Sequence, residues 1–289
     1  MTLPRRRFLT ICAAAAVLPR GARAAGWQGV ALGADVSVTL EGAGADAALV
    51  DLPGLLERIE AVFSLYRPSE LTRLNADGAG PVSDWMAQAL ALCDRLHGLT
   101  GGAFDPTVQP LWRALAGGGD LASARRAVGW GRVRLGETVT LDKGQALTLN
   151  GMAQGFAADL VRDWLARRGF THALVDMGEQ AALGGPFHIG IADPAAGLLA
   201  SRSLRGGRAL ATSSPRATLI AGQPHILHPQ GLPPLWSTVA VEADSAALAD
   251  GLSTALVFAT PAEIAGLRRA VPELGPVALV DGSGDLQTV

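Results

Sequence analysis

The chain has little cysteine, with only Cys12 and Cys93 among its 289 residues. Cys12 lies in an N-terminal segment that has the pattern of a removable leader, so the mature chain would keep Cys93 alone. A single cysteine excludes a disulfide framework and a cysteine-based metal site. Because Cys93 stands near Leu90 and Leu96 on an apolar helical face, we expect it to be a small buried core residue.

Long apolar runs are also missing. The apolar run of the N-terminal segment, residues 11–18, is far shorter than the ~20 residues that a membrane-spanning helix needs. Arg5 and Arg6 precede this run, and a small-residue cleavage site follows at residues 22–24. The pattern predicts a twin-arginine signal peptide over 1–24 and a periplasmic mature protein without a membrane span. A general secretory signal is the alternative.

A broad basic surface is the third missing feature. The formal charge of −2 becomes −7 when the leader is removed, because the leader contains five arginines: Arg5, Arg6, Arg7, Arg20 and Arg23. An acidic mature chain without a lysine and arginine cluster argues against binding to nucleic acid or to an anionic membrane. Any phosphate-containing partner must therefore be bound by local chemistry.

The rest of the chain predicts one compact α+β domain, residues 25–289. Hydrophobic residues make up 49% of the sequence, and 36 glycines and 17 prolines indicate many turns between short elements. Hydrophobic periodicity predicts helices over 47–63, 84–99, 153–168, 245–258 and 261–270, the second of them capped by Asp84. Strands are predicted over 30–40, 173–177, 188–192, 209–212, 238–241 and 277–280.

The first segment with possible chemistry is GGAFDPTVQPLW at 101–112. Its glycines permit a close backbone approach to a ligand, and Pro106 restricts the conformation of Asp105. A glycine loop followed by Asp-Pro is also an ordinary turn. This segment alone does not decide between the two interpretations.

The second segment is NGMAQGFAAD at 150–159, in which Gly151 and Gly155 lead into a predicted helix. Backbone amides at the start of a helix favour phosphate, and the carbonyl of Gly151 is available to a cation. The alternative is that the two glycines only allow tight helix packing.

The third segment is ADGLSTAL at 249–256, in which Asp250 and Thr254 lie four residues apart on one face of an apolar helix. A carboxylate and a hydroxyl are the hard oxygen ligands that Mg²⁺ prefers, and the remaining positions are left to water and substrate phosphate. The alternative is a solvent-facing aspartate and a threonine that bonds back to its own helix.

Together and in this order, the three segments resemble the ApbE family of FAD:protein FMN transferases. The resemblance runs from about residue 29 to 281 and includes YRPSEL at 66–71, RLN at 73–75, HIGIADP at 188–194, LATSS at 210–214 and HILHP at 225–229. It implies an ApbE-like, T-fold-related domain with mixed sheets and packed helices around a flavin cleft. It also implies FAD as substrate, Mg²⁺ on its pyrophosphate, and transfer of FMN to a threonine of a target protein with release of AMP.

The same resemblance implies roles for individual residues. The dinucleotide would contact Leu32, Tyr66, Ala103, Phe104, Asp105, Thr148, Gln154 and His225. The cation would be bound by the carbonyl of Gly151 and the side chains of Asp250 and Thr254. Asp250 and His225 are the predicted catalytic residues; His225 either accepts the proton of the target hydroxyl or only orients the reacting groups.

The chain departs from the family pattern at several positions. Many relatives have an aspartate at the position of Thr148 and a lysine at the position of Gln154, so two opposite charges are replaced together. Glu179 replaces a usual glycine, and His228 replaces a usual aspartate. These departures resemble an exported, NosX-like branch, whose target would be a membrane-bound electron-transfer subunit of the NosR type. Two other functions remain open: a flavin-binding carrier without transferase activity, and an Mg²⁺-dependent hydrolase that converts FAD to FMN and AMP.

Overall fold

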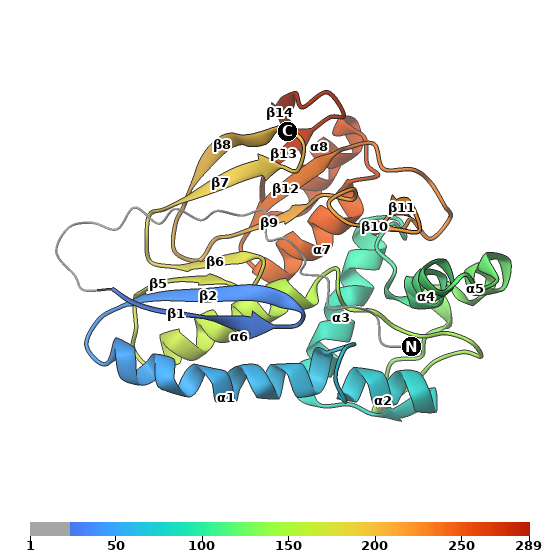
Figure 1. Cartoon of the computed structure of the whole chain (residues 1–289), viewed down its shortest axis with the longest axis horizontal. Helices are drawn as coiled ribbons and strands as arrows, with labels where there is room; N and C mark the ends of the chain where they lie inside the picture. The colour runs from blue at the N-terminus through green and yellow to red at the C-terminus, as the bar shows by residue number, and fades with distance from the viewer. Residues whose placement is uncertain (1–23) are drawn as a thin grey trace.

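The computed structural model describes residues 24–289, which form an α+β domain around a large antiparallel sheet (Figure 1). The predicted signal peptide at 1–24 lies outside the described residues except for its last position. Eight strands form the sheet in the order β1-β2-β5-β6-β9-β12-β13-β14, and every neighbouring pair is antiparallel. The predicted fold class is therefore confirmed.

The strands of this sheet are β1 Ala25–Ala31, β2 Ala34–Glu41, β5 His172–Asp176, β6 Gln180–Leu183, β9 Ala209–Ser213, β12 Thr238–Ala243, β13 Leu274–Val280 and β14 Leu286–Thr288. Three two-stranded pairs lie outside it: β3 Ala79–Pro81 with β4 Thr138–Thr140, β7 Phe187–Asp193 with β8 Gly197–Leu204, and β10 Leu219–Ile220 with β11 Gln223–Pro224. The helices are α1 Ala45–Phe63, α2 Glu70–Asp77, α3 Asp84–Leu99, α4 Gln109–Gly117, α5 Leu121–Ala127, α6 Ala153–Arg167, α7 Ala246–Leu256 and α8 Pro261–Ala270, with short 3-10 turns at Pro106–Val108 and Trp130–Arg132.

The first predicted strand, over 30–40, is wrong, because the structure has a β1–β2 hairpin there. The turn residues Leu32 and Gly33 both have positive φ, at 50° and 84°, as a tight two-residue turn that follows the twist of the sheet requires. Apolar residues recur at even positions from Val30 to Leu40, so the sequence pattern hides the reversal, although the inward-facing positions change from odd in β1 to even in β2. The turn places Leu32 at the end of the sheet.

The predicted helices are confirmed within a few residues, but the proposed cap of the second one is wrong. Asp84 is the first residue of α3, and the side chain of Ser83 caps the helix by accepting a hydrogen bond from the amide of Met86. Pro53 lies within α1 without ending the helix. Cys93 is fully buried in α3, as expected.

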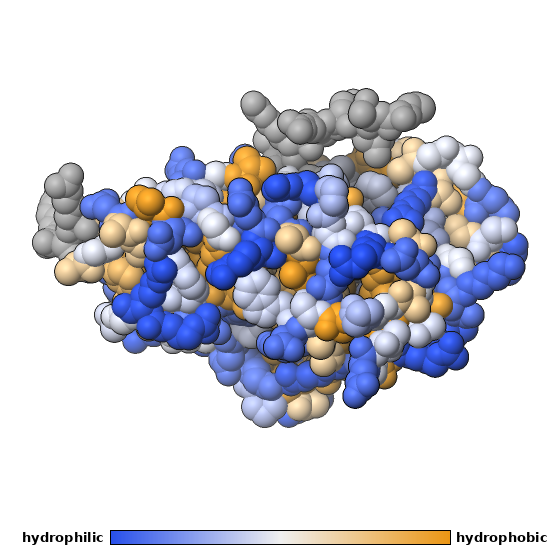
Figure 2. Space-filling model, turned by 90° about the horizontal axis from the view of Figure 1, so that it is seen from below, coloured by the Kyte–Doolittle hydropathy of each residue, from blue (hydrophilic) through white to orange (hydrophobic). Residues whose placement is uncertain are grey.

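The two faces of the large sheet are covered differently. One face packs against helices, with α1, α6 and α7 contributing buried leucines and alanines to the main core. The opposite face packs against the β7–β8 hairpin in a smaller core that includes Phe187, Ile189 and Leu204. The side of the molecule shown in Figure 2 is mainly hydrophilic, with small scattered apolar patches. No helix within residues 24–289 is long and apolar enough to cross a membrane.

Helices α6 and α7 cross unusually closely, and the residues at this crossing position the site. A Cβ at Gly155 would overlap the carbonyl oxygen of Ala246, so only glycine fits there. The carboxylate of Asp159 in α6 accepts hydrogen bonds from the Ser245 hydroxyl at 2.7 Å and from the amides of Ala246 and Ala247 at 3.0 Å each. The start of α7 is thereby bound to α6 by three hydrogen bonds to one side chain.

Candidate active site

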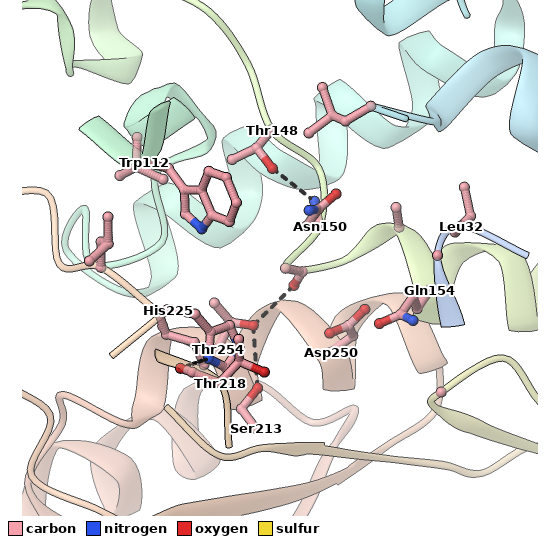
Figure 3. Close-up of a pocket in the computed structure, with 18 of the residues that line it drawn as sticks. Leu32, Trp112, Thr148, Asn150, Gln154, Ser213, Thr218, His225, Asp250 and Thr254 are labelled. Atoms are coloured by element: carbon pink, nitrogen blue, oxygen red, sulfur yellow. Dashed lines mark hydrogen bonds between the residues drawn. The ribbon is translucent and has the colours of Figure 1, made fainter. Parts of the chain in front are cut away.

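A cavity of about 490 Å³ opens where the helical layer meets one end of the sheet (Figure 3). This volume is in the range of small-molecule sites. The cavity brings together every site residue predicted from the sequence: Leu32, Tyr66, Ala103, Phe104, Asp105, Thr148, Gly151, Gln154, His225, Asp250 and Thr254. Their individual roles stay predictions.

Three oxygen-bearing groups converge at the crossing of α6 and α7. The hydroxyl of Thr254 lies 3.3 Å from the carbonyl oxygen of Gly151, and Asp250 Oδ2 accepts a hydrogen bond from the amide of Gly155 at 3.0 Å. Ligands of an octahedral Mg²⁺ at 2.0–2.1 Å are about 3 Å apart when adjacent. The Gly151–Thr254 spacing and the hard oxygen donors therefore fit the predicted cation.

Burial changes the electrostatics of this region strongly. Asp250 is 3% exposed, and burial raises the pKa of its carboxyl to about 7, against the lowering effect of the Gly155 amide. Burial also raises the pKa of Glu179 well above its usual value, and the nearby charge of Asp250 adds to the effect. Burial raises the pKa of Asp176 as well. Two carboxyl groups buried in one cavity need either protons or a bound cation.

His225 lies beside Thr218 and Thr254 in the cavity (Figure 3). Its Nδ1 is 3.0 Å from the carbonyl oxygen of Pro215 and 3.2 Å from that of Thr218. Carbonyls only accept, so Nδ1 carries the proton and Nε2 is the basic nitrogen of the neutral ring. Burial lowers the pKa of His225, which keeps the ring neutral near pH 7.

His228 lies outside the residues that line the cavity. Its Nδ1 accepts a hydrogen bond from the amide of Gln230 at 3.1 Å, and its ring packs edge-on against Phe258 at a centroid distance of 4.9 Å. This position indicates a structural role in the loop that follows His225.

Another part of the cavity wall consists of turns. Leu32 keeps its positive φ while its amide donates a hydrogen bond to the buried Glu60 carboxylate at 2.6 Å. The Tyr66 hydroxyl, at the mouth of the cavity, lies 3.2 Å from Nδ2 of Asn150. A non-glycine residue with positive φ is uncommon, and it persists only where surrounding contacts hold it.

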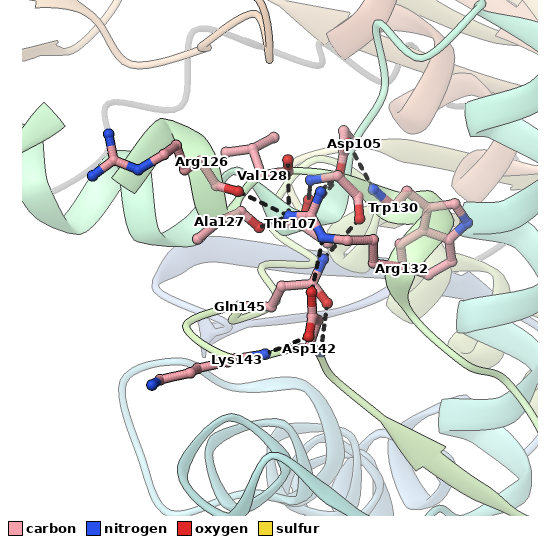
Figure 4. Close-up of polar contacts among 11 residues, drawn as sticks. Asp105, Thr107, Arg126, Ala127, Val128, Trp130, Arg132, Asp142, Lys143 and Gln145 are labelled. Carbon is pink, nitrogen blue, oxygen red and sulfur yellow. Dashed lines mark hydrogen bonds and ion pairs between the residues drawn. The ribbon is translucent and has the colours of Figure 1, made fainter. Parts of the chain in front are cut away.

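The carboxylate of Asp105 is hydrogen-bonded within the protein. Its Oδ1 accepts from the amide and hydroxyl of Thr107 at 2.8 and 2.5 Å, and its Oδ2 accepts from the amide of Trp130 at 3.1 Å (Figure 4). Both carboxylate oxygens therefore hold the glycine loop against the segment around Trp130. Asp105 lines the cavity, but its charge is directed into the protein.

Sequence reasoning missed three residues that shape the site. Asp159 anchors α7, Glu179 is a buried carboxylate in the cavity, and Trp112 forms part of the wall. The four-residue spacing of Gly155 and Asp159 placed both on α6. It did not show that α7 is the helix that packs against them. Glu179 appeared only as a departure from the family pattern, and its position beside Asp250 comes from the chain reversal between β5 and β6.

Comparison with known proteins matches residues 32–274 to the ApbE family. An FAD:protein FMN transferase of Vibrio cholerae is 29% identical over 242 residues, which cover 72% of each protein. The apo crystal structure of the flavinyl transferase ApbE of Pseudomonas stutzeri has a TM-score of 0.80 at 23% identity and covers 94% of this chain and 97% of its own.

Two further structures share the fold. The flavin transferase ApbE of Vibrio cholerae has a TM-score of 0.79 at 25% identity and covers 93% of this chain and 97% of its own. The ApbE protein of Thermotoga maritima has a TM-score of 0.80 at 22% identity, with coverage of 92% and 96%. The family match extends over most of the chain and includes all of the cavity residues named above, so the chain belongs to the ApbE family.

Proposed function

We propose that this protein transfers the FMN part of FAD to a threonine of a target protein in an Mg²⁺-dependent reaction that releases AMP. Membership of the family supports the flavin transfer. The observation that carries the proposal is the meeting of the Gly151 carbonyl, the Asp250 carboxylate and the Thr254 hydroxyl in one cavity. These groups are suited to a cation on a diphosphate.

The reaction forms a bond between the target hydroxyl oxygen and the phosphorus on the FMN side, and it breaks the bond from that phosphorus to the bridging oxygen. The hydroxyl proton leaves during the attack, and AMP departs with the bridging oxygen. A bound Mg²⁺ would neutralise the charge that develops on the phosphate oxygens. His225 fits the proton-accepting role, because its Nδ1 is held by carbonyls and its basic nitrogen is Nε2.

The flavin half of the substrate would lie against the part of the cavity wall that is built of turns. The Leu32 turn, Tyr66 and the loop at 103–105 surround that part of the cavity. Gln154 lies next to Asp250 in Figure 3, in the position where many relatives carry a lysine. An amide in this place can donate a hydrogen bond to a phosphate but adds no charge, so the cation must supply most of the phosphate neutralisation.

One assay tests this proposal against the two other functions. The mature protein is incubated with FAD, Mg²⁺ and a candidate target domain that contains a reactive threonine, and both covalent flavin fluorescence and AMP are measured. We expect labelled target and AMP in equal amounts, and neither after addition of EDTA. AMP with free FMN and an unlabelled target would indicate the hydrolase, and bound FAD without AMP would indicate the carrier.

We also propose a periplasmic location, with export by the twin-arginine route and a NosR-type membrane subunit as the target. The paired arginines Arg5 and Arg6 and the short apolar run support the export route. Replacement of both arginines by lysine should retain the precursor in the cytoplasm. Export of that variant at the normal level would favour the general secretory route.

A further inference from the structure

We propose that Glu179 supplies a second negative charge to the cation site, so that the protein binds a divalent cation tightly before any nucleotide is present. This inference rests on the proposed function, because it concerns the same cation. Glu179 is not one of the three predicted ligands. With its charge in the site, the cation is expected to bind before the nucleotide.

The position of Glu179 is defined by backbone contacts. It lies in the tight connection between β5 and β6, where its carbonyl accepts a hydrogen bond from the amide of Met177 at 3.1 Å. Its Oε2 accepts a hydrogen bond from the amide of Thr212 in β9 at 2.9 Å. Glu179 is only 6% exposed and lines the same cavity as Asp250. The side chain is thus held inside the cavity wall.

The charges in the cavity are unbalanced. Within residues 24–289, neither Asp250 nor Glu179 forms an ion pair with a lysine, arginine or histidine. Arg113 is the only lysine or arginine among the described residues that line the cavity, and it is exposed at the surface. Buried charges in proteins are paired or bind metals. Two carboxylates match the charge of one divalent cation.

The surroundings of Glu179 contain a further polar group without a partner. Thr212 lines the cavity, and its Oγ1 is buried and makes no hydrogen bond within the described structure. The neighbouring Ser213 hydroxyl lies 3.4 Å from Oγ1 of Thr254, which joins β9 to the predicted ligand set. Oxygen atoms that can bind a cation or its water ligands therefore lie in a continuous series from Gly151 and Thr254 to Thr212, whose amide binds Glu179. This arrangement suits a cation with its water shell.

The test measures cation binding without flavin. Mn²⁺ serves as the probe because it shares the oxygen-ligand preference of Mg²⁺ and its free form is quantified by electron paramagnetic resonance. We expect Glu179→Gln and Glu179→Gly each to weaken Mn²⁺ binding to the mature protein by roughly 10–100-fold, the range found for residues that support metal ligands. Asp250→Asn should weaken it further.

Glu70→Gln is the matched control. Glu70 is also a buried glutamate whose carboxylate accepts one backbone hydrogen bond, from Ser83 at 2.7 Å, but it lies outside the cavity. We expect this variant to change Mn²⁺ affinity less than about twofold. Thermal unfolding with and without Mn²⁺ distinguishes a loss of stability from a loss of cation binding. Purely structural damage lowers the melting temperature equally in both conditions and leaves the Mn²⁺-induced increase unchanged.

The outcomes separate this inference from the proposed function. Unchanged Mn²⁺ affinity in both Glu179 variants, together with loss of affinity in Asp250→Asn, would overturn the role of Glu179 and leave the cation site intact. Unchanged affinity in all three variants would overturn the cation site itself. A third outcome combines two results: the Glu179 variants lose Mn²⁺ affinity, and the wild-type protein labels no target. This outcome would uphold the inference and reject the transferase.

Discussion

The two walls of the cavity are built on different principles. The wall with the proposed cation ligands, here called the cation wall, lies where two helices cross at Gly155 and are joined by Asp159; its Asp250 is buried, and its Gly151 and Thr254 are partly buried. The wall proposed for the flavin, here called the flavin wall, consists of turns, with Leu32 in a strained conformation and Tyr66 56% exposed. Groups on packed helices keep their geometry within narrow limits, whereas groups on turns adapt more easily to a ligand. The rigid wall should therefore determine the reaction, and the turn wall should determine substrate affinity.

The largest expected effect is at Asp250. Asp250→Asn retains an oxygen that can accept the Gly155 hydrogen bond but removes the charge at the cation site. We expect FMN transfer to fall by about 10²–10³-fold, as for removal of one group that stabilises transition-state charge. Initial rates of covalent flavin incorporation at saturating FAD measure this effect. Transfer within fivefold of the wild-type rate would show that the cation wall does not control the chemistry.

The next effect concerns the joint between the helices. Asp159→Asn should destabilise the protein by about 1–3 kcal/mol, because Asp159 accepts three hydrogen bonds at the start of α7. The matched control is Asp163→Asn, four residues later in α6, where the carboxylate is half exposed and pairs with Arg162. Urea unfolding measures both. Equal stability of the two variants would remove the structural reason for a rigid cation wall.

A smaller effect is expected in the pH dependence of stability without a metal. Folding raises the pKa values of Asp250 and Glu179, so the native protein holds protons that the unfolded chain has released above about pH 4. The contribution of this pair to stability therefore falls as pH rises from about 4 and becomes constant above the native pKa values.

Glu179→Gln removes one of the two groups, so the metal-free variant should gain stability relative to wild type between pH 5 and pH 8. The expected gain is about 2 °C or more in melting temperature, which corresponds to roughly 1 kcal/mol in a domain of this size. Calorimetry in EDTA measures the difference, with Glu57→Gln on the surface of α1 as the control. If the difference in melting temperature between Glu179→Gln and wild type stays constant with pH, the ionisation of Glu179 does not contribute to the pH dependence of stability.

The smallest effect is expected on the flavin wall. Tyr66→Phe removes only the contact to Asn150 and should change the KM for FAD by less than about threefold, as expected for one exposed hydrogen bond. Tyr66→Ala also removes the ring from the cavity and should raise the KM about tenfold with little change in kcat. Steady-state kinetics distinguish the two. An equal fall in kcat for both variants would place Tyr66 in the chemical step and would contradict the contrast between the walls.

Local patterns predicted much of this molecule. The apolar spacing in α1, α3 and α7 identified these helices, and the four-residue separation of Asp250 and Thr254 placed both on one helical face. The β1–β2 turn was missed, because alternation continues through Leu32 and Gly33. The sequence also did not reveal that the carboxylate of Asp105 accepts hydrogen bonds from Thr107 and Trp130.

The sequence by itself determined the α+β class, the helix that carries the acid and the alcohol, and the family pattern that names the cavity residues. Only the tertiary structure decided that Glu179 lies in the same cavity as Asp250, 71 positions away in the chain, and that Asp159 fixes the start of α7. Periodicity reports which face of an element is apolar, whereas the neighbours of a polar side chain depend on how distant elements pack. The charge balance of the site is a property of that packing.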